Sequence, residues 1–414
     1  MSLVKPFRAL RPAPGRADDV VAPPYDVVDR AEAKALAEGR PWSFLHISRP
    51  EIDLADDVDP YDACVYETGR KNLDRMVAEG VLVRDTAPAY YAYRLTMGEH
   101  VQTGLVATAS VEAYDNDRIK KHEFTRPVKE DDRVRQIDTL NAQTGPVFLV
   151  YAANKAVDDT LRAVTRGEPD IDVTAERDGV RHEIWKIDDA ANVATLTEAF
   201  DAMPAIYVAD GHHRSAAGSR VGNARRAANP GHTGEEGYNH FLSVIFPHDQ
   251  MQILDYNRVV RDLNGHSKDD LLAAIGESFD LEVSTEPVKP RHTGEFGMYL
   301  DGQWYRLQIH AESIPDDDPV ARLDVSLLQD NLIQPLLGVA DPRRDDRIDF
   351  VGGIRGLAGL EKRVDGGDWQ VAFSLYPTTM QALMDVADAG EVMPPKSTWF
   401  EPKLADGLIS HVLD

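Results

Sequence analysis

The chain has 414 residues, more than a single hydrophobic core usually supports, so its length predicts two subdomains. Its composition, 43% hydrophobic and 28% charged, is that of a globular protein and does not indicate disorder. The formal net charge of −25 argues against nucleic acids and anionic membranes as partners, because binding to either neutralises phosphates with Lys and Arg.

Several absences in the sequence favour the cytoplasm. No run of about eighteen apolar residues indicates a transmembrane helix. The first residues lack the apolar region of a signal peptide. The single cysteine, Cys64, permits no internal disulfide. We therefore expect a cytoplasmic protein with no membrane partner, and the sequence is compatible with a homo-oligomer.

Apolar residues recur with periods of both 3.6 and 2, which predicts an α/β fold of the mixed α+β kind. Polar capping residues and glycines mark the expected ends of the helices and strands. Up to residue 151 we expect a capped helix at 29–39, a strand at 43–48, a helix at 61–79, a hairpin of 90–97 and 101–111, a partly helical segment at 126–143 and a buried strand at 147–151.

The second half of the sequence continues this alternation. We expect a helix at 188–202, a short buried strand at 205–209, a helix at 212–228, paired strands at 239–247 and 251–260, a surface turn at 314–319 and a helix at 320–334. The pattern restarts after Leu263. We therefore predict a main α/β domain at 1–262 and a C-terminal α/β subdomain at 263–414.

The most informative segment is the turn Asp210-Gly-His-His-Arg214 between the strand at 205–209 and the helix at 212–228. A strand that runs directly into a helix leaves backbone N–H groups unpaired at the positive end of the helix dipole, which favours an anion. Gly211 permits close approach of a ligand, Arg214 offers a fork to phosphate oxygens, and Asp210 is placed to cap the helix. The alternative is a capped surface helix whose histidines face solvent.

Two further segments carry charge in unusual patterns. Glu123 lies among His122, Lys120, Lys121 and Arg126, where a carboxylate would stay ionised and could act as a general base; the alternative is a solvated helix face. Near the C-terminus, Lys396, Ser397, Thr398 and Lys403 occupy a proline-stiffened loop that suits an anionic ligand or a lid, unless Trp399 and Phe400 simply anchor the chain end.

A metal site is a weaker interpretation of the same histidines. Asp210, His212 and His213 could bind an ion together with His122 or His46, but adjacent histidines rarely chelate one ion. The sequence contains no GxxxxGK[ST], GxGxxG, CxxC or HExxH motif. We therefore predict no protein-held metal.

The segment Ala209 to Ala217 (ADGHHRSAA) resembles the turn shared by the ParB/sulfiredoxin superfamily, and in particular the DGHHR of free-serine kinases. The whole chain also resembles the bacterial and archaeal family catalogued as domain of unknown function one-thousand-and-fifteen. The segments that carry this second resemblance are Ala22-Pro-Pro-Tyr-Asp26, Phe44-Leu-His46, His122-Glu-Phe-Thr125, Asp132-Arg133, Ala209 to Arg214 and Pro395-Lys-Ser-Thr-Trp-Phe400.

The kinase resemblance implies a ParB/sulfiredoxin-like core with N-terminal and C-terminal α/β additions. It gives Gly211, His212, His213 and Arg214 the role of holding nucleotide phosphates. Those kinases also carry a catalytic glutamate in a Pro-His-Glu element, which Lys121-His122-Glu123 matches best. The chain departs from that pattern because lysine replaces proline and the spacing to the turn is longer.

From these residues we predict a phosphotransferase that acts on serine or phosphoserine with ATP or ADP, with Mg²⁺ carried by the nucleotide. The catalytic set is Glu123 as base, with His122 and Asp210. Lys396, Ser397, Thr398 and Lys403 join the nucleotide site, where Lys396 or Lys403 offsets charge. The alternatives are a ParB-like nucleotide-binding module without catalysis and a metal-dependent hydrolase.

Overall fold

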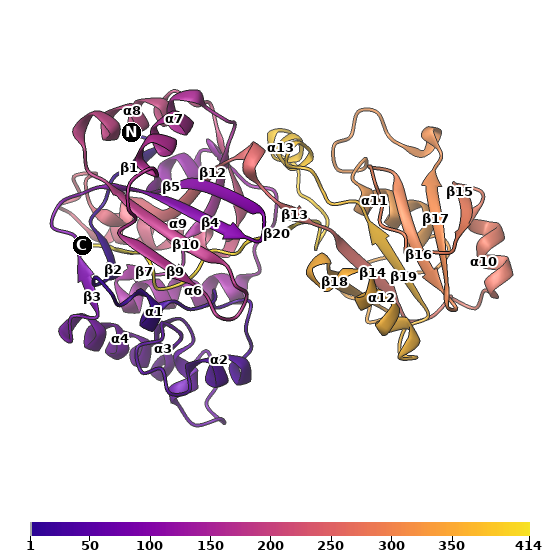
Figure 1. Ribbon diagram of the computed structural model, residues 1–414, viewed down its shortest axis with the longest axis horizontal. Helices are drawn as coiled ribbons and strands as arrows, with labels where there is room; N and C mark the ends of the chain where they lie inside the picture. Colours follow the sequence, from indigo (N-terminus) through magenta and orange to yellow (C-terminus); the bar gives the residue numbers. More distant parts are fainter. Residues whose placement is uncertain (1) are drawn as a thin grey trace. The chain divides into compact units, whose positions relative to one another are not determined.

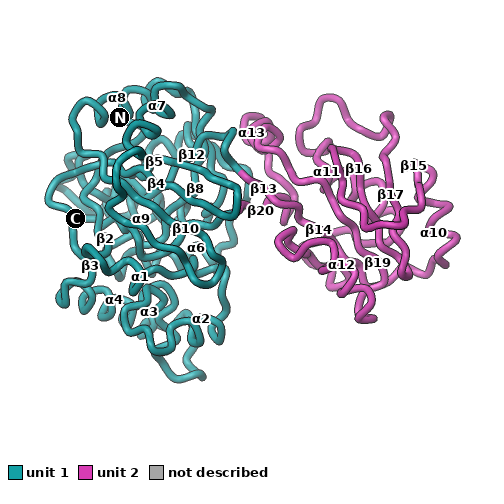
Figure 2. The backbone as a smooth tube through the Cα atoms, in the orientation of Figure 1, with its two compact units in different colours: residues 1–251, 402–414 teal, residues 252–401 magenta. Residues whose placement is uncertain are grey.

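The computed structural model describes residues 2–414 and divides the chain into two compact units (Figure 2). Unit 1 contains residues 1–251 and 402–414, and unit 2 contains residues 252–401. This division differs from the expected boundary at residue 262. Strand β14 (Tyr256–Val260) pairs with β18 and β19 of unit 2, and β21 (Ser410–Val412) returns to pair with β2 and β7 of unit 1. These pairings join segments far apart in the sequence.

Unit 1 is built on a mixed nine-stranded sheet in the order β6-β11-β8-β12-β5-β4-β10-β9, with β1 also paired to β5 (Figure 1). Within it β11 is parallel to β6, and β12 is parallel to β8. The strands are β1 (Val4–Lys5), β4 (Tyr90–Met97), β5 (His100–Ser110), β6 (Ile119–Lys120), β8 (Val147–Tyr151), β9 (Ile171–Thr174), β10 (Arg181–Ile187), β11 (Ile206–Asp210) and β12 (His240–Pro247).

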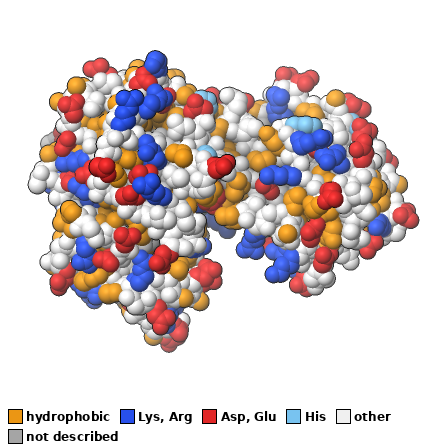
Figure 3. All heavy atoms as spheres, viewed as in Figure 1, with side chains coloured by type: hydrophobic (Ala, Val, Ile, Leu, Met, Phe, Trp, Pro, Cys, Tyr) orange, Lys and Arg blue, Asp and Glu red, His pale blue; other side chains and the backbone are white. Residues whose placement is uncertain are grey.

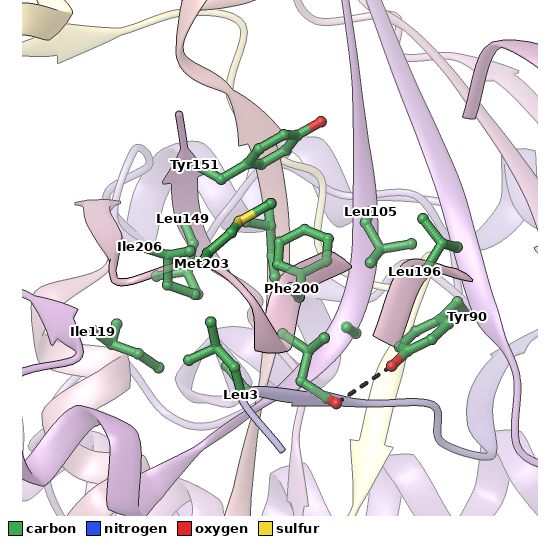
Figure 4. Close-up of a cluster of buried hydrophobic side chains, with 14 of the residues drawn as sticks. Leu3, Tyr90, Leu105, Ile119, Leu149, Tyr151, Leu196, Phe200, Met203 and Ile206 are labelled. Atoms are coloured by element: carbon green, nitrogen blue, oxygen red, sulfur yellow. Dashed lines mark hydrogen bonds between the residues drawn. The ribbon is translucent and has the colours of Figure 1, made fainter. Parts of the chain in front are cut away.

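Helices cover this sheet and bury its apolar side chains. Helices α7 (Lys155–Val164) and α8 (Ala190–Asp201) contribute Leu161, Leu196 and Phe200 to the hydrophobic core of this sheet, and Figure 4 shows Leu196 and Phe200 among its buried side chains. Helices α6 (Pro127–Leu140) and α9 (His212–Ala228) pack against each other. Burial of this apolar area is the main stabilising contribution to unit 1.

A four-stranded sheet and the N-terminal helices form a second layer of unit 1. The sheet has the order β3-β2-β21-β7, with strands β2 (Ala9–Pro12), β3 (Leu82–Arg84), β7 (Ala142–Gln143) and β21. Its core includes Phe44, Leu73 and Met76. Helix α2 begins as expected, because Asp29 and Glu32 form a reciprocal capping box. The helices of this layer are α1 (Ala17–Val20), α2 (Arg30–Ala37), α3 (Leu45–Ser48) and α4 (Ala63–Ala78), whereas α5 (Val111–Asp115) packs into the core of the nine-stranded sheet.

Unit 2 is an antiparallel six-stranded sheet in the order β15-β17-β16-β19-β14-β18, with a two-stranded β13-β20 ribbon. Helix α12 contributes Leu360 and Val364 to a core with Trp304 and Trp369. Its further elements are β13 (Ile253–Leu254), α10 (Lys268–Ile275), β15 (Phe279–Ser284), β16 (Glu295–Leu300), β17 (Gln303–Ile309), α11 (Asp324–Leu328), β18 (Ile348–Gly352), α12 (Gly356–Asp365), β19 (Val371–Leu375), α13 (Met380–Asp388) and β20 (Trp399–Phe400).

The expected mixed α/β class is confirmed, but three expected elements are wrong. In the segment 43–48, expected as a strand, Leu45–Ser48 form helix α3, because a short apolar run fits either structure when it is buried. The strands at 239–247 and 251–260 do not pair with each other, since β12 lies between β5 and β8 of unit 1. The helix expected at 320–334 is α11 followed by a π-helical turn at Gln329–Ile333.

Charged side chains of both signs lie on the surface, as the composition predicts. Lys and Arg are interspersed with Asp and Glu on the face of each unit that Figure 3 shows. No helix formed by residues 2–414 is both long and apolar enough to cross a membrane.

Candidate functional site

The turn Asp210 to Arg214 lies at a strand-to-helix junction. Strand β11 is buried between β6 and β8, and its pairing with β8 is interrupted by a bulge at Ala209. The chain then turns at Gly211, and α9 starts at His212. The carbonyl of Gly211 accepts hydrogen bonds from the amides of Arg214 (2.9 Å) and Ser215 (3.0 Å). The amides of His212 and His213 lie in this first helical turn, where backbone N–H groups have no partner within the helix.

Gly211 adopts a left-handed backbone conformation, with φ 92° and ψ 29°. A Cβ atom at this position would lie 2.8 Å from Nε of Arg214, because the arginine side chain folds back beside the turn. Both the conformation and the contact require glycine. The sharp turn therefore depends on this residue.

We expect Gly211→Ala to lower the free energy of unfolding by roughly 2–3 kcal/mol, because it adds a clash to the left-handed strain of about 1–2 kcal/mol. Gly39→Ala is the matched control. Gly39 has φ +72°, and a Cβ there meets nothing within 4 Å, so that variant carries only the backbone strain. Urea unfolding of both variants measures the difference. Equal losses would show that Arg214 does not restrict the turn.

Asp210 does not cap α9, contrary to the sequence prediction. The N-cap residue is Gly211, and no side chain caps the helix. The Asp210 carboxylate instead accepts the Gly211 N–H (2.8 Å) and pairs with Lys403 Nζ (3.1 Å). Burial opposes its ionisation, but the charges of Lys403 and Arg214 outweigh burial and lower the pKa of Asp210. Asp210 therefore holds Lys403 beside the turn.

The segment His122-Glu123 reaches the same turn from 87 positions upstream of Asp210. Strand β6 is parallel to β11, with Lys120 opposite Tyr207, so the residues that follow the two strands lie side by side. A Glu123 carboxylate oxygen is 3.8 Å from Nδ1 of His212. The rings of His122 and His212 meet edge to face, with centroids 4.5 Å apart.

Both imidazoles in this group are buried and neutral at pH 7. Burial lowers the pKa of His122 to about 4, although the carbonyl of Val208 and the charge of Asp210 favour the protonated ring. Burial and the neighbouring His122 lower the pKa of His212 well below its ordinary value of 6.5. Neither ring therefore supplies a positive charge to a phosphate.

His213 and Arg214 contact residues other than the His122, Glu123 and His212 group. Nε2 of His213 accepts the backbone N–H of Arg126 (3.0 Å). The Arg214 side chain is only 10% exposed, and its guanidinium lies 3.8 Å from a carboxylate oxygen of Asp26. Its Nε has no hydrogen-bond partner among residues 2–414. The guanidinium therefore lies largely inside the protein, close to the turn.

A small cavity on this inner side is lined by Tyr25, Arg133, Gly145, Arg214 and Asp406, among others. The Arg133 guanidinium stacks on the Tyr25 ring at 3.9 Å. Asp406 is 2% exposed and accepts the backbone N–H of Tyr25 (3.2 Å). Sequence reasoning missed Asp406, which lies in no recognisable motif, and named Tyr25 and Asp26 only as part of a segment that carries the family resemblance.

The C-terminal loop divides between the two units. Lys403 belongs to unit 1 and pairs with Asp210, as described above. Lys396, Ser397 and Thr398 belong to unit 2. There Lys396 lies over the Tyr256 ring at 5.5 Å, and the Ser397 hydroxyl donates to the Pro394 carbonyl (2.7 Å). Of the four predicted residues in this loop, Lys403 lies in the same unit as the turn and pairs there with Asp210.

Comparison with known proteins identifies the family. The family model described as "Protein of unknown function (DUF1015)" matches residues 4–326. The chain belongs to this family. This confirms the family resemblance inferred from the motifs, and all the quoted segments except the last lie in the matched region. A search of curated proteins finds no match.

Solved structures show distant similarity. A free serine kinase in complex with AMP is 13% identical, with a TM-score of 0.36, and the match covers 73% of this chain and 92% of that chain. A conserved hypothetical protein from Pyrococcus furiosus is 13% identical, with a TM-score of 0.34 and coverages of 76% and 98%. C-terminally truncated SbnI from Staphylococcus aureus is 10% identical, with a TM-score of 0.38 and coverages of 73% and 85%.

Proposed function

We propose that this DUF1015 protein is a small-molecule phosphotransferase that moves a phosphoryl group between a nucleotide, ATP or ADP, and serine or phosphoserine. The observation that carries the proposal is the meeting of two segments. A glycine turn opens the N-terminus of α9, and Glu123 lies 3.8 Å from His212 on that first helical turn. An anion site and a candidate base therefore adjoin, as phosphoryl transfer to a hydroxyl requires.

The phosphates would bind at the start of α9. The amides of His212 and His213 and the positive end of the helix dipole favour an anion there. Lys403, held by Asp210 at 3.1 Å, adds a positive charge next to Gly211. Arg214 would contribute its charge from beneath the turn, and a bidentate contact would need its side chain to rotate outward. Mg²⁺ would arrive bound to the nucleotide phosphates.

Glu123 would accept the proton of the serine hydroxyl. The hydroxyl oxygen would bond to the terminal phosphorus while the bridging P–O bond to the nucleotide breaks, so ATP gives ADP, or ADP gives AMP, together with phosphoserine. The reverse direction uses the same groups in the opposite order. Phe124 follows Glu123 and is 76% exposed, so its ring is available to stack on a nucleobase.

The phosphate site is tested by placing a carboxylate in it. In His213→Asp the new charge lies in the first turn of α9, where it repels phosphate but suits the helix dipole. We expect at least about tenfold weaker binding of Mg·ADP, which corresponds to about 1.4 kcal/mol, with little change in melting temperature. Isothermal titration calorimetry and thermal unfolding measure the two quantities.

Ala191→Asp is the matched control, because it places the same charge at the second position of α8 in the same unit, where Ala191 is exposed. Its Mg·ADP affinity should equal that of the wild type. Unchanged affinity in His213→Asp would contradict the phosphate site. Binding that is normal without any transfer to serine would instead favour a nucleotide-binding regulatory module.

A further inference from the structure

We propose that His122, Glu123 and His212 form a binding site for a divalent transition-metal ion, for which zinc is the probe. One ligand atom from each residue lies within 4.8 Å of the others. Ligands around a tetrahedral zinc with bonds of about 2.1 Å lie about 3.4 Å apart. Small rotations of the side chains, above all of the 54% exposed Glu123, would close that gap.

The two imidazoles provide independent support. His122 and His212 are 2% and 4% exposed. Within residues 2–414, Nδ1 of His122 and Nε2 of His212 are buried and have no hydrogen-bond partner. A buried polar atom without a partner is unfavourable, and a metal ion is one group that would satisfy it. The two rings meet edge to face with centroids 4.5 Å apart, and one ligand nitrogen from each lies within 4.8 Å of the other and of a Glu123 oxygen.

The surroundings of His122 resemble those of a metal ligand. The carbonyl of Val208 forms a hydrogen bond with its ring, which leaves the unpartnered Nδ1 as the atom that can bind an ion. Metal-binding histidines commonly donate their second nitrogen in this way, because the bond fixes the ring orientation. Val208 lies in β11, the strand that also leads to His212. One strand therefore orients the first histidine and positions the second.

The donor set indicates the class of ion. Two imidazole nitrogens and one carboxylate suit zinc and other late divalent transition metals, whereas Mg²⁺ and Ca²⁺ prefer oxygen ligands. Three protein ligands leave at least one position for water or a phosphate oxygen. This ion would therefore be distinct from the Mg²⁺ that accompanies a nucleotide. The inference departs from the sequence prediction of no protein-held metal, which considered Asp210, His212 and His213 with His122 or His46, but not Glu123.

The site shares Glu123 with the proposed phosphotransferase. A carboxylate that binds a metal is a weaker base, so zinc in this cluster would inhibit transfer. The metal proposal does not require the transferase to exist, because its test measures binding alone. Failure of either proposal therefore leaves the other open.

The experiment titrates zinc into the full chain after removal of metals by a chelator. We expect one Zn²⁺ per chain by calorimetry and a visible absorption band when Co²⁺ replaces it. Glu123→Gln should bind zinc at least about tenfold more weakly, and His122→Gln and His212→Gln about 100-fold more weakly. His182→Gln is the matched control, since His182 is equally buried but hydrogen-bonds to Tyr93 at 2.8 Å.

Several outcomes would overturn the site. They are the absence of stoichiometric zinc binding, unchanged affinity in Glu123→Gln, or an equal loss in His182→Gln. Circular dichroism and thermal unfolding establish whether the histidine variants fold. If they do not, Glu123→Gln decides alone, because an exposed carboxylate can change without disturbing the core.

Discussion

Glu123→Gln is expected to lower the rate of phosphoryl transfer by roughly 100- to 10,000-fold while the affinity for Mg·ADP stays within about twofold. Glutamine keeps the size of the side chain but cannot accept a proton from the hydroxyl. In the proposed site the phosphates would be held by the amides of α9 and by Lys403, which the substitution leaves in place. Initial rates and a calorimetric titration on the same preparation separate the two effects.

The control for this variant is Glu112→Gln, which changes an exposed carboxylate of helix α5 in the same unit. Its rate should equal that of the wild type. Both assays contain excess Mg²⁺ and a zinc-selective chelator, so that no metal ion occupies Glu123. A Glu123→Gln rate within about threefold of the wild type would mean that another group accepts the proton.

We expect the free energy of unfolding of Asp406→Asn to increase relative to that of the wild type as the pH rises from 4 to 8. Burial is the main cause that raises the pKa of Asp406 from an ordinary value of 3.8 to about 7; the charges of Arg214 and Arg133 oppose this shift, and the charge of Asp26 favours it. The raised pKa means that folding favours the protonated carboxyl. That contribution is fully present below about pH 4 and is lost as the pH rises through 7.

The difference between the two pKa values corresponds to about 4 kcal/mol, which is the upper limit of the effect. Asparagine cannot ionise, so Asp406→Asn does not lose this contribution to stability as the pH rises. Urea unfolding at a series of pH values measures the difference in free energy between variant and wild type. Asp57→Asn, at an exposed position, should show a difference that does not change with pH. A flat difference for Asp406→Asn as well would mean that its carboxyl is solvated.

Local patterns predicted the elements that adjoin the site. The alternation of Tyr90–Met97 and the glycine at the following turn give the β4-β5 hairpin, since Gly98 has the expected positive φ of 59°. The buried run Val147–Tyr151 is β8, and α9 covers the expected residues His212–Ala228. In these segments local propensity, hydrophobic period and turn residues all favour one structure.

The sequence did not predict which strands pair when they lie far apart along the chain. Residues 410–412 return to unit 1, and β12 pairs within unit 1 while β14 pairs within unit 2. The partners lie far apart along the chain, and no local pattern specifies which strands meet. The helix at Leu45–Ser48 illustrates a second limit, because a short buried apolar run has no distinguishing period.

For the candidate site as well, local features were predicted from the sequence and long-range contacts were not. The strand, the glycine turn and the helix of Asp210 to Arg214 follow from local pattern, and the anion site at that junction stays a prediction from the same pattern. The approach of Glu123 to His212 was expected only from the family resemblance, because it depends on the parallel pairing of β6 with β11. The burial of Arg214 beside Asp26 and Asp406 depends on segments nearly 200 residues away on either side, and no local pattern indicates it.

Phosphorus NMR of the full chain with Mg²⁺, nucleotide and amino acid tests the central claim most directly. Samples contain ATP or ADP with serine, and in the reverse direction AMP or ADP with phosphoserine. The proposed function predicts that the phosphoserine signal appears, or disappears, in proportion to the change in nucleotide, that no inorganic phosphate accumulates, and that Glu123→Gln blocks the exchange. Bound nucleotide with no transfer in either direction, or release of inorganic phosphate alone, would contradict it.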